Sequence, residues 1–168
     1  MPHYPLKFPM VIALVVLHYI RPAQITAAIA SQLITTDEYY ASTFNIPMAA
    51  GIFYSLPGAF TDSSKIVINQ TQATALGWKN PQDAIGKQVV FQASGGFRCT
   101  IAGVTKDFHL GSLQKTIQPV TFIHVGVNRV FRSMSFKLKP GNIGASMEAL
   151  QRQWSILLPG TPFEYSFM

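Results

Sequence analysis

The chain has 168 residues, of which 48% are hydrophobic, and this is enough to bury a core in one domain with two lobes. Its formal net charge is +6, but the lysines and arginines are spread along the chain rather than clustered, which argues against a nucleic-acid-binding face. Only 12% of the residues are charged, a low share that suits a protein whose surfaces are partly covered by partners or membrane. The single cysteine, Cys99, excludes an internal disulfide and sits where a strand would bury a small side chain.

The first apolar run, residues 10–17, has two interpretations. It ends at His18 and Arg21, so it is shorter than the roughly 17 to 25 apolar residues of a transmembrane helix. Its valine, isoleucine and leucine residues lie between two prolines, which favours a buried strand. Lys7 before the run and small residues after it also resemble a signal peptide, and this alternative stays open.

Residues 25–46 are predicted to form a strand followed by a short helix. Either Thr36 or Asp37 can cap the start of that helix with a side-chain oxygen. Tyr40 and Phe44 are spaced to lie one turn apart on the same helix face.

The middle of the chain alternates short strands with short helices. The predicted elements are strands over 48–53, 65–68, 88–92 and 97–102, a helix over 70–76 and a helical turn over 81–85. Asn69 is a good N-cap for the longer helix, which Gly77 closes. Gly103 is expected to loosen and end the last strand.

Two strands, a helix and a final strand are predicted after residue 119. The strands cover 120–125, 131–138 and 163–167, and the helix follows Asn142 and ends before Pro159. An apolar stripe at helical spacing is expected to be buried in the core: Ile143, Met147, Leu150, Trp154 and Leu157. The order of elements indicates an α+β fold in which β-α-β elements pack onto small mixed sheets.

No catalytic, metal or cofactor site is predicted. The Gly86–Lys87 pair is not a phosphate-binding loop, because Pro81 and Gln88 occupy positions that need glycine and Ser or Thr. The four histidines are far apart and lack acidic or cysteine partners at ligand spacing. We therefore expect that the chain is not an enzyme.

Residues 106–113 form a polar connection that should lie at the surface. Asp107, His109 and Ser112 lie close together, but three residues on one short loop rarely reach the distances of a hydrolytic triad. The side chains of Asp107 and Ser112 are instead expected to satisfy backbone groups of the turn. Phe108 and Leu113 offer apolar anchors on either side of the polar residues.

The same region resembles a known family. The segment at residues 101–109 reads Ile-Ala-Gly-Val-Thr-Lys-Asp-Phe-His, and Ser112–Leu113 and Ile117-Gln-Pro119 follow it. This is similar to the periplasmic core domain of MacB-like ABC transporter permeases, in the FtsX-like permease superfamily. Further matches occur in the family's order at residues 37–40, 43–44, 67–69, 75–78, 84–87 and 159–167. The family usually has Gly-Arg where this chain has Gly51–Ile52, so no role of that arginine is carried over.

The resemblance implies an extracytoplasmic domain on the periplasmic side of the bacterial inner membrane. Such a domain relays ATP-driven motion of the transmembrane helices to substrate or partner proteins in export. It implies membrane-embedded permease segments and a cytosolic ABC ATPase as partners, allows a homodimer, and involves neither nucleic acid nor a cofactor. The lobes would be an inserted lobe over 53–108 and a flanking β-α-β lobe over 1–52 and 109–168. The chain is expected to be a fragment or split gene product without the transmembrane helices.

Within this interpretation, the connection after the central strand is the candidate structural and coupling loop. Its residues are Lys106, Asp107, Phe108, Ser112 and Leu113. Two other classes stay open. A free-standing periplasmic binding or adaptor module would carry the same lobes without a membrane anchor, and a basic nucleic-acid-binding protein would show steeply salt-dependent binding.

Overall fold

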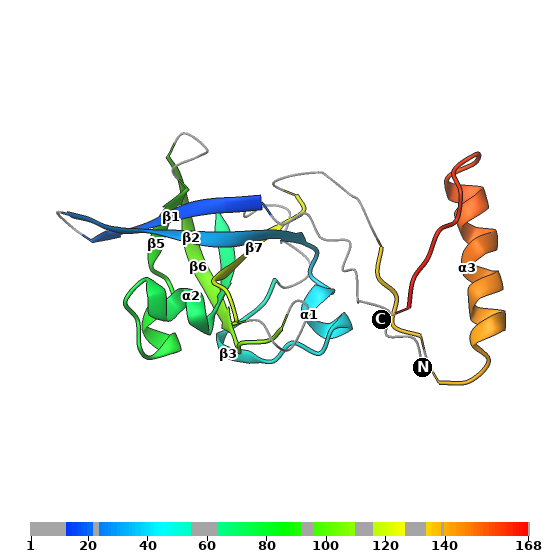
Figure 1. The fold of residues 1–168 in the computed structure, drawn as a ribbon, viewed down its shortest axis with the longest axis horizontal. Coiled ribbons are helices and arrows are strands. Elements are labelled where there is room, and N and C mark those ends of the chain that lie inside the picture. The colour runs from blue at the N-terminus through cyan, green and yellow to red at the C-terminus, as the bar shows by residue number, and fades with distance from the viewer. Residues whose placement is uncertain are drawn as a thin grey trace. The chain divides into compact units, whose positions relative to one another are not determined.

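The computed structural model describes residues 13–21, 24–54, 64–91, 96–109, 116–126, 134–138 and 140–167, with side chains from residue 29 onward. The chain divides into two compact units, Met1–Met134 and Ser135–Met168, here called the first and second unit. Figure 1 shows the elements of each. The sheet and the shorter helices belong to the first unit, and the described residues of the second unit include one long helix.

Seven strands among the described residues of the first unit form one mixed sheet. They are β1 (Ala13–Arg21), β2 (Gln24–Thr36), β3 (Met48–Gly51), β4 (Lys65–Asn69), β5 (Gln88–Phe91), β6 (Phe97–Thr105) and β7 (Val120–His124). The strand order is β3-β6-β4-β7-β2-β1-β5, and β5 also pairs with β6. The pairings therefore close into a ring of six strands, with β3 added beside the second half of β6.

Strand directions in the ring are mixed. β2 runs parallel to β7 and β4 runs parallel to β6, whereas the other pairs are antiparallel. This mixed sheet with short helices confirms the predicted α+β class. Strands from residues 1–52, 53–108 and 109–168 all take part in it, and the division into an inserted and a flanking lobe stays a prediction.

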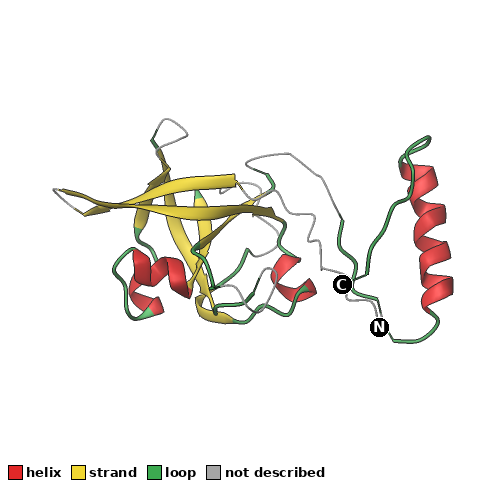
Figure 2. Cartoon of the chain, viewed as in Figure 1, coloured by secondary structure: helices red, strands yellow, loops and turns green. Residues whose placement is uncertain are grey.

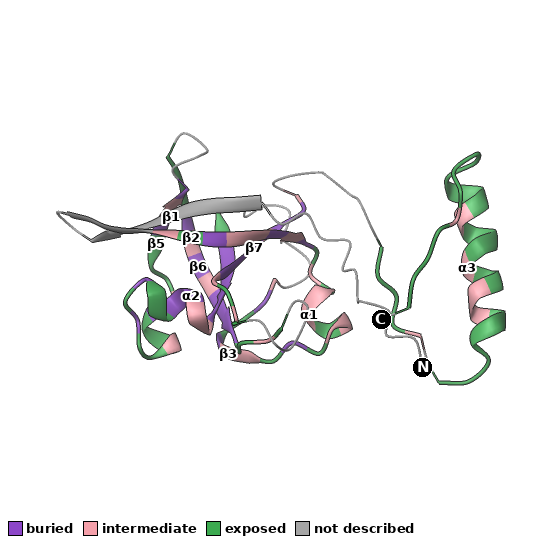
Figure 3. Ribbon diagram, viewed as in Figure 1, coloured by how far each residue is buried: buried purple, intermediate pink, exposed green. Residues whose placement is uncertain are grey.

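In the described part of the chain, three short helices accompany the sheet: α1 (Tyr40–Thr43), α2 (Gln70–Ala75) and η1 (Pro81–Ala84). The apolar side chains gather in two clusters, to both of which the strand β4 contributes. Figure 3 shows that the buried residues are concentrated in the part of the chain that holds the sheet. Ile66 and Ile68 belong to the cluster that includes residues of α2 and η1. Val67 points to the opposite face and joins the cluster around Phe122. Cys99 is buried in the first cluster, as predicted.

The predicted end of the central strand was wrong. β6 continues through Gly103 to Thr105, and Gly103 pairs with both Gly51 and Val67. A side chain at Gly103 would collide with the Ile52 carbonyl oxygen, so glycine allows a close approach of two backbones here. Gly103 therefore lies where β6 closely approaches a neighbouring backbone, and the strand does not end there.

The other predicted elements of the first unit agree with the structure except at one helix cap. Residues 13–17 of the first apolar run lie in strand β1, and residues 10–12 are outside the described part. Neither proposed cap serves α1: its N-cap is Tyr39, without a side-chain cap. Asp37 instead stabilises the turn before the helix, where its carboxylate accepts a hydrogen bond from the Tyr39 backbone N–H at 3.1 Å. The rings of Tyr40 and Phe44 lie on one face with their centroids 4.7 Å apart, as predicted.

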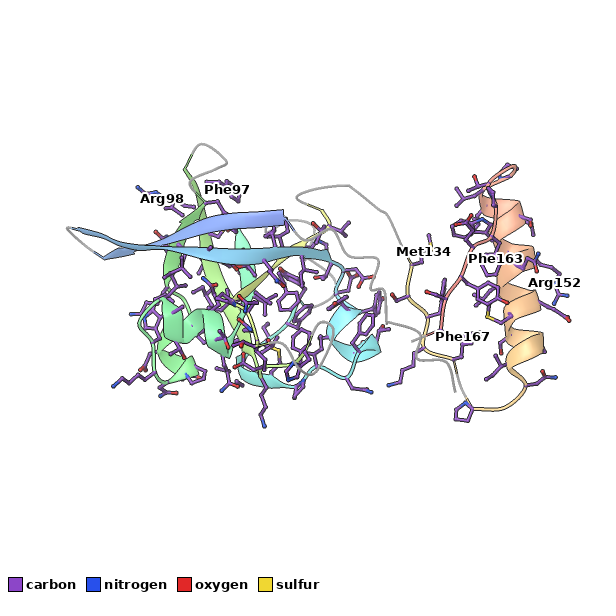
Figure 4. All side chains as sticks on the ribbon, in the orientation of Figure 1. Phe97, Arg98, Met134, Arg152, Phe163 and Phe167 are labelled. Carbon is purple, nitrogen blue, oxygen red and sulfur yellow. The ribbon has the colours of Figure 1, made fainter. Side chains whose placement is uncertain are left out.

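In the second unit, helix α3 (Ile143–Leu157) forms where it was predicted, and Asn142 caps it by accepting a hydrogen bond from Ala145 N–H at 3.1 Å. The expectation that its apolar stripe is buried was wrong, because no residue of α3 is buried. Trp154 is half-buried, with its ring centroid 5.9 Å from that of Phe163, and its Nε1–H donates to the Thr161 carbonyl at 3.1 Å. Figure 4 shows Phe163 beside the helix, whereas Arg152 projects from its opposite side.

The strands predicted at 131–138 and 163–167 were also wrong where the structure describes them. Residues 134–138 and 163–167 have no strand hydrogen bonding (Figure 2), and residues 131–133 lie outside the described part. Both segments alternate apolar and polar residues, but alternation gives a strand only where a neighbouring strand completes the ladder. Large apolar side chains such as Met134, Phe136 and Phe167 are more than half exposed.

Candidate functional site

The candidate loop begins where two parallel strands end side by side. Asn69 at the end of β4 pairs with Thr105 at the end of β6. The chain then turns from β4 into α2, and from β6 into the segment 106–109. The backbone N–H of Lys106 donates to the Pro47 carbonyl at 2.8 Å, which ties the loop to the residue before β3. The side chain of Lys106 is exposed.

Asp107 fastens the loop to the first turn of α2. One carboxylate oxygen, Oδ1, accepts a hydrogen bond from the Thr71 backbone N–H at 2.9 Å, and Oδ2 accepts one from the Thr71 hydroxyl at 2.8 Å. The Asp107 backbone N–H donates in return to the side-chain oxygen of Gln70 at 3.4 Å. A carboxylate at this position satisfies a helix N–H that has no partner within the helix and faces the positive end of the helix dipole.

Phe108 anchors the loop in the core. Its ring is half-buried and stacks on Phe122 of β7, with centroids 6.1 Å apart and planes 18° apart. It packs against the apolar cluster that contains Val67 and Phe122. The next residue, His109, is exposed.

Three consecutive residues thus contact three different parts of the first unit. Lys106 binds the residue before β3, Asp107 binds α2, and Phe108 packs on β7. The two remaining residues of the candidate loop, Ser112 and Leu113, lie outside the described residues. The coupling role assigned to the loop stays a proposal.

The contacts of residues 106–108 with the residue before β3, with α2 and with β7 are here called the junction. Asn69 adds to this junction through its buried side chain. Its Oδ1 accepts hydrogen bonds from the backbone N–H groups of Gln72 and Val120, both at 2.9 Å, and its Nδ2 donates to the Gln118 carbonyl at 2.9 Å. The first bond is the predicted helix cap. The other two join the end of β4 to the start of β7, which the local sequence did not indicate.

Sequence reasoning missed a second polar cluster at the opposite end of β7. His124 is buried, and its Nε2 lies 3.2 Å from Oε2 of Glu38, whose side chain is 10% exposed. Its other ring nitrogen, Nδ1, accepts a hydrogen bond from the Gly126 backbone N–H at 3.1 Å. Glu38 and His124 are 86 residues apart in the sequence, so only the pairing of β2 with β7 brings them together.

An aromatic side chain also contacts this cluster. The ring of Tyr54 meets that of His124 edge-on at 5.2 Å, and its hydroxyl donates to the Phe122 carbonyl at 2.7 Å. Burial raises the pKa of the Tyr54 phenol well above its ordinary value, so this group stays neutral. Burial likewise raises the pKa of Tyr40 to about 12.

The chemistry of these sites is that of hydrogen bonding and packing. Both carboxylate oxygens of Asp107 accept hydrogen bonds from Thr71. Burial raises the pKa of the Cys99 thiol to about 12, so this sulfur stays protonated and is a poor nucleophile. Among the described residues, no three His, Cys, Asp or Glu side chains are grouped so as to hold a metal ion. No helix in the described part of the chain is long and apolar enough to cross a membrane.

The fold and the junction define an α+β domain whose strand ends are fixed to one another by a buried asparagine and a helix-capping aspartate. The family model of the MacB-like periplasmic core domain matches residues 7–155. The chain therefore belongs to the family of MacB-like periplasmic core domains.

Several solved structures are similar to this chain. The periplasmic region of MacB from Actinobacillus actinomycetemcomitans has a TM-score of 0.62 at 13% identity, over 89% of this chain and 65% of that one. A domain of a permease protein from Porphyromonas gingivalis has a TM-score of 0.57 at 18% identity, over 91% of this chain and 77% of that one. The extracellular domain of the noncanonic ABC-type transporter YknZ from Gram-positive bacteria has a TM-score of 0.47 at 14% identity, over 71% and 54%. This chain spans 65% of the MacB periplasmic region. A search of curated proteins finds no match.

Proposed function

We propose that this chain is the relay domain of an ABC transporter permease on the periplasmic side of the bacterial inner membrane. It passes ATP-driven motion of membrane-embedded permease segments to substrate or partner proteins during export. Its partners are those membrane segments and a cytosolic ABC ATPase, and a homodimer is part of the proposal. Membership in the MacB-like family supports this function.

The observation that carries the proposal is the junction at residues 106–108. A relay needs elements that move as one body, because compliant contacts would absorb a displacement instead of passing it on. Backbone, carboxylate and ring contacts from three consecutive residues bind β3, α2 and β7 to the end of β6. Displacement of one strand end is thereby shared by the others. The role is mechanical, and the chain itself is proposed to lack enzymatic activity.

The first experiment asks whether the protein is held at the membrane. A tag is added at the gene's own locus, and cells are separated into osmotic-shock, membrane and cytosolic fractions. The proposal expects the tagged protein in the membrane fraction, sensitive to protease in spheroplasts, and purifying together with an ABC ATPase. Release by osmotic shock without an ATPase would instead show a free-standing periplasmic module.

The second experiment tests the relay without knowledge of the substrate. Spin labels are placed at the exposed positions Thr74 and Glu148, one in each unit, in the purified permease–ATPase complex. The distance between them is measured with and without ATP and vanadate. The proposal expects a nucleotide-dependent distance change that Asp107→Ala reduces while ATP hydrolysis continues, with His109→Ala as the matched control. An unchanged distance distribution in the wild-type complex would contradict the relay.

A third experiment addresses the proposed lack of enzymatic activity. The isolated chain is expected neither to bind nor to hydrolyse ATP, because the sequence around Gly86 and Lys87 lacks the residues of a phosphate-binding loop. Saturable nucleotide binding at micromolar affinity in calorimetry would refute this part of the proposal.

A further inference from the structure

Gln72 is a fully buried polar residue in the first turn of α2. Its backbone N–H donates to Asn69 Oδ1 at 2.9 Å. In contrast, neither Oε1 nor Nε2 of its side chain has a hydrogen-bond partner among the described residues. The next residue, Ala73, belongs to the apolar cluster that contains Ile66 and Ile68. A carboxamide is therefore buried next to the core with all its hydrogen-bonding groups unpaired, which strongly disfavours folding unless another molecule pairs with them.

A second unpaired polar group lies close by, at Thr105. This last residue of β6 pairs with Met48 of β3 on one side and with Asn69 of β4 on the other. It is fully buried, and its Oγ1 has no hydrogen-bond partner within the described part of the chain. Gln72 and Thr105 are thus both direct neighbours of Asn69, the first through the helix cap and the second across the strand pair.

Other buried polar side chains of the sheet are paired within the protein. The side chain of Asn69 makes three hydrogen bonds, and the hydroxyl oxygens of Ser31 and Thr121 lie 2.8 Å apart. Thr36, which also has an unpaired buried hydroxyl, lies at the end of β2. The unpaired atoms of Gln72 and Thr105 are therefore concentrated at one place, beside the junction.

We propose that Gln72 and Thr105 bind a buried water molecule. The carboxamide needs a partner that both donates and accepts, because Nε2 carries two hydrogens and Oε1 carries only lone pairs. A cation would pair with the oxygen alone and an anion with the nitrogen alone, and neither side chain has a charge to attract an ion. Water takes both roles and makes about three hydrogen bonds in a typical buried site.

The bound water joins the first turn of α2 to the end of β6. Asp107, which follows β6, reaches the same turn of α2 through Thr71 at an exposed position. The two elements are therefore connected both at the surface and in the interior. The inference rests on burial and on the missing protein partners, and it does not depend on the proposed transport function.

The direct test is a crystal structure of the full chain at a resolution that shows ordered water. We expect a water within hydrogen-bond distance of the Gln72 carboxamide and of Thr105 Oγ1. NMR of the 15N-labelled chain gives an independent measurement in solution. Cross-peaks between the Gln72 side-chain amide and water should have opposite signs in NOE and ROE spectra, as long-lived bound water produces, and the exposed Gln82 should show no such pair. A carboxamide without water, or one bonded to a protein group instead, overturns the proposal.

Two near-isosteric variants test the residues that bind the water. Gln72→Met should lose the water and should not raise the urea midpoint, because the hydrogen bonds to water disappear and part of the volume is left unfilled. A dry, unpaired carboxamide predicts the opposite, a midpoint above that of the wild type. Thr105→Val should reduce the occupancy of the water, whereas the control Gln82→Met should change neither the water nor the midpoint. A raised midpoint in Gln72→Met, or full occupancy in Thr105→Val, overturns the two-residue site.

Discussion

Asp107 holds Thr71 through both of its carboxylate oxygens, although the two residues are 36 positions apart in the sequence. One bond reaches the backbone of the first turn of α2 and the other reaches the Thr71 hydroxyl. A loop that leaves one strand therefore supplies a cap to the helix that follows another. The strength of this connection can be measured by substitution.

Asp107→Ala should lower the free energy of unfolding by about 1 kcal/mol, because the Thr71 N–H and hydroxyl lose their acceptors at an exposed site. Asp107→Asn retains one oxygen and should lose about half as much. The measurement is urea unfolding, with Asp83→Ala as the control, since Asp83 is an exposed carboxylate in η1. If Asp107→Ala lowers the free energy of unfolding no more than this control does, the bidentate contact does not stabilise the fold.

Phe108→Ala should lower stability by about 2 kcal/mol or more through the loss of its packing on Phe122. The neighbouring His109→Ala should stay within about 0.5 kcal/mol, since an exposed imidazole has little packing to lose. Denaturant unfolding of both variants, compared with the wild type, checks the difference. Equal losses at the two positions would contradict the anchoring of the loop by Phe108.

Asn69→Ala should be more damaging, at about 3 kcal/mol, because three hydrogen-bonding groups would lose their partner and two of them, the N–H groups of Gln72 and Val120, would be left buried. Asn69→Asp keeps the accepting oxygen but not the donor to the Gln118 carbonyl, and should fall between Asn69→Ala and the wild type. The matched control is Asn80→Ala, which removes an exposed cap from η1 and should cost about 1 kcal/mol. A loss at Asn69 no larger than at Asn80 would show that its links to β7 add nothing.

Trp154→Ala should leave the unfolding of the first unit unchanged. The chain has two tryptophans, Trp78 in the buried core of the first unit and Trp154 on α3. Because Trp154 is half-buried, its loss should destabilise the second unit by about 1 to 2 kcal/mol, less than the 3 to 5 kcal/mol of a core tryptophan. The remaining fluorescence, from Trp78, reports the first unit, and circular dichroism reports α3. A lower urea midpoint at Trp78 would mean that the units unfold together.

Gly103→Ala should prevent folding or cost more than about 3 kcal/mol, because the new methyl group meets the Ile52 carbonyl and two backbones must separate. Gly144→Ala is the control, since a methyl group there meets a single side-chain atom, Asn142 Oδ1, at 3.3 Å and no backbone, and lies in a helix that favours alanine. Soluble yield and thermal midpoint distinguish the variants. Tolerance of Gly103→Ala would show that β3 and β6 can separate.

The sequence predicted those features well that depend on interactions between residues close together in the chain. Asn69 before a run of helix formers marks an N-cap, and the cap forms as expected. Tyr40 and Phe44 meet on one face because four residues make about one helical turn. The same logic failed at Gly103, where a glycine within an alternating pattern fits either a strand end or a close backbone approach, and only the neighbouring strand decides.

The contacts that make up the candidate site could not be predicted in the same way. Thr71 lies 36 residues from Asp107 and Glu38 lies 86 residues from His124, and their meeting depends on which strands lie side by side. The stripe on α3 was predicted as core because its spacing fits burial. Spacing alone identifies an apolar face and does not identify what covers it.

Because the strand pairings close into a ring, the sheet has few unpaired edges to which another molecule could add a strand. An open sheet offers unpaired backbone groups at each border, where a strand from another molecule can add and begin a fibre. Here every described strand except β3 has neighbours on both sides, and β3 is only four residues long. Such a short edge strand offers few backbone groups to a strand of another molecule. Insertions that lengthen Met48–Gly51 should therefore increase edge-to-edge aggregation more than changes elsewhere on the ring.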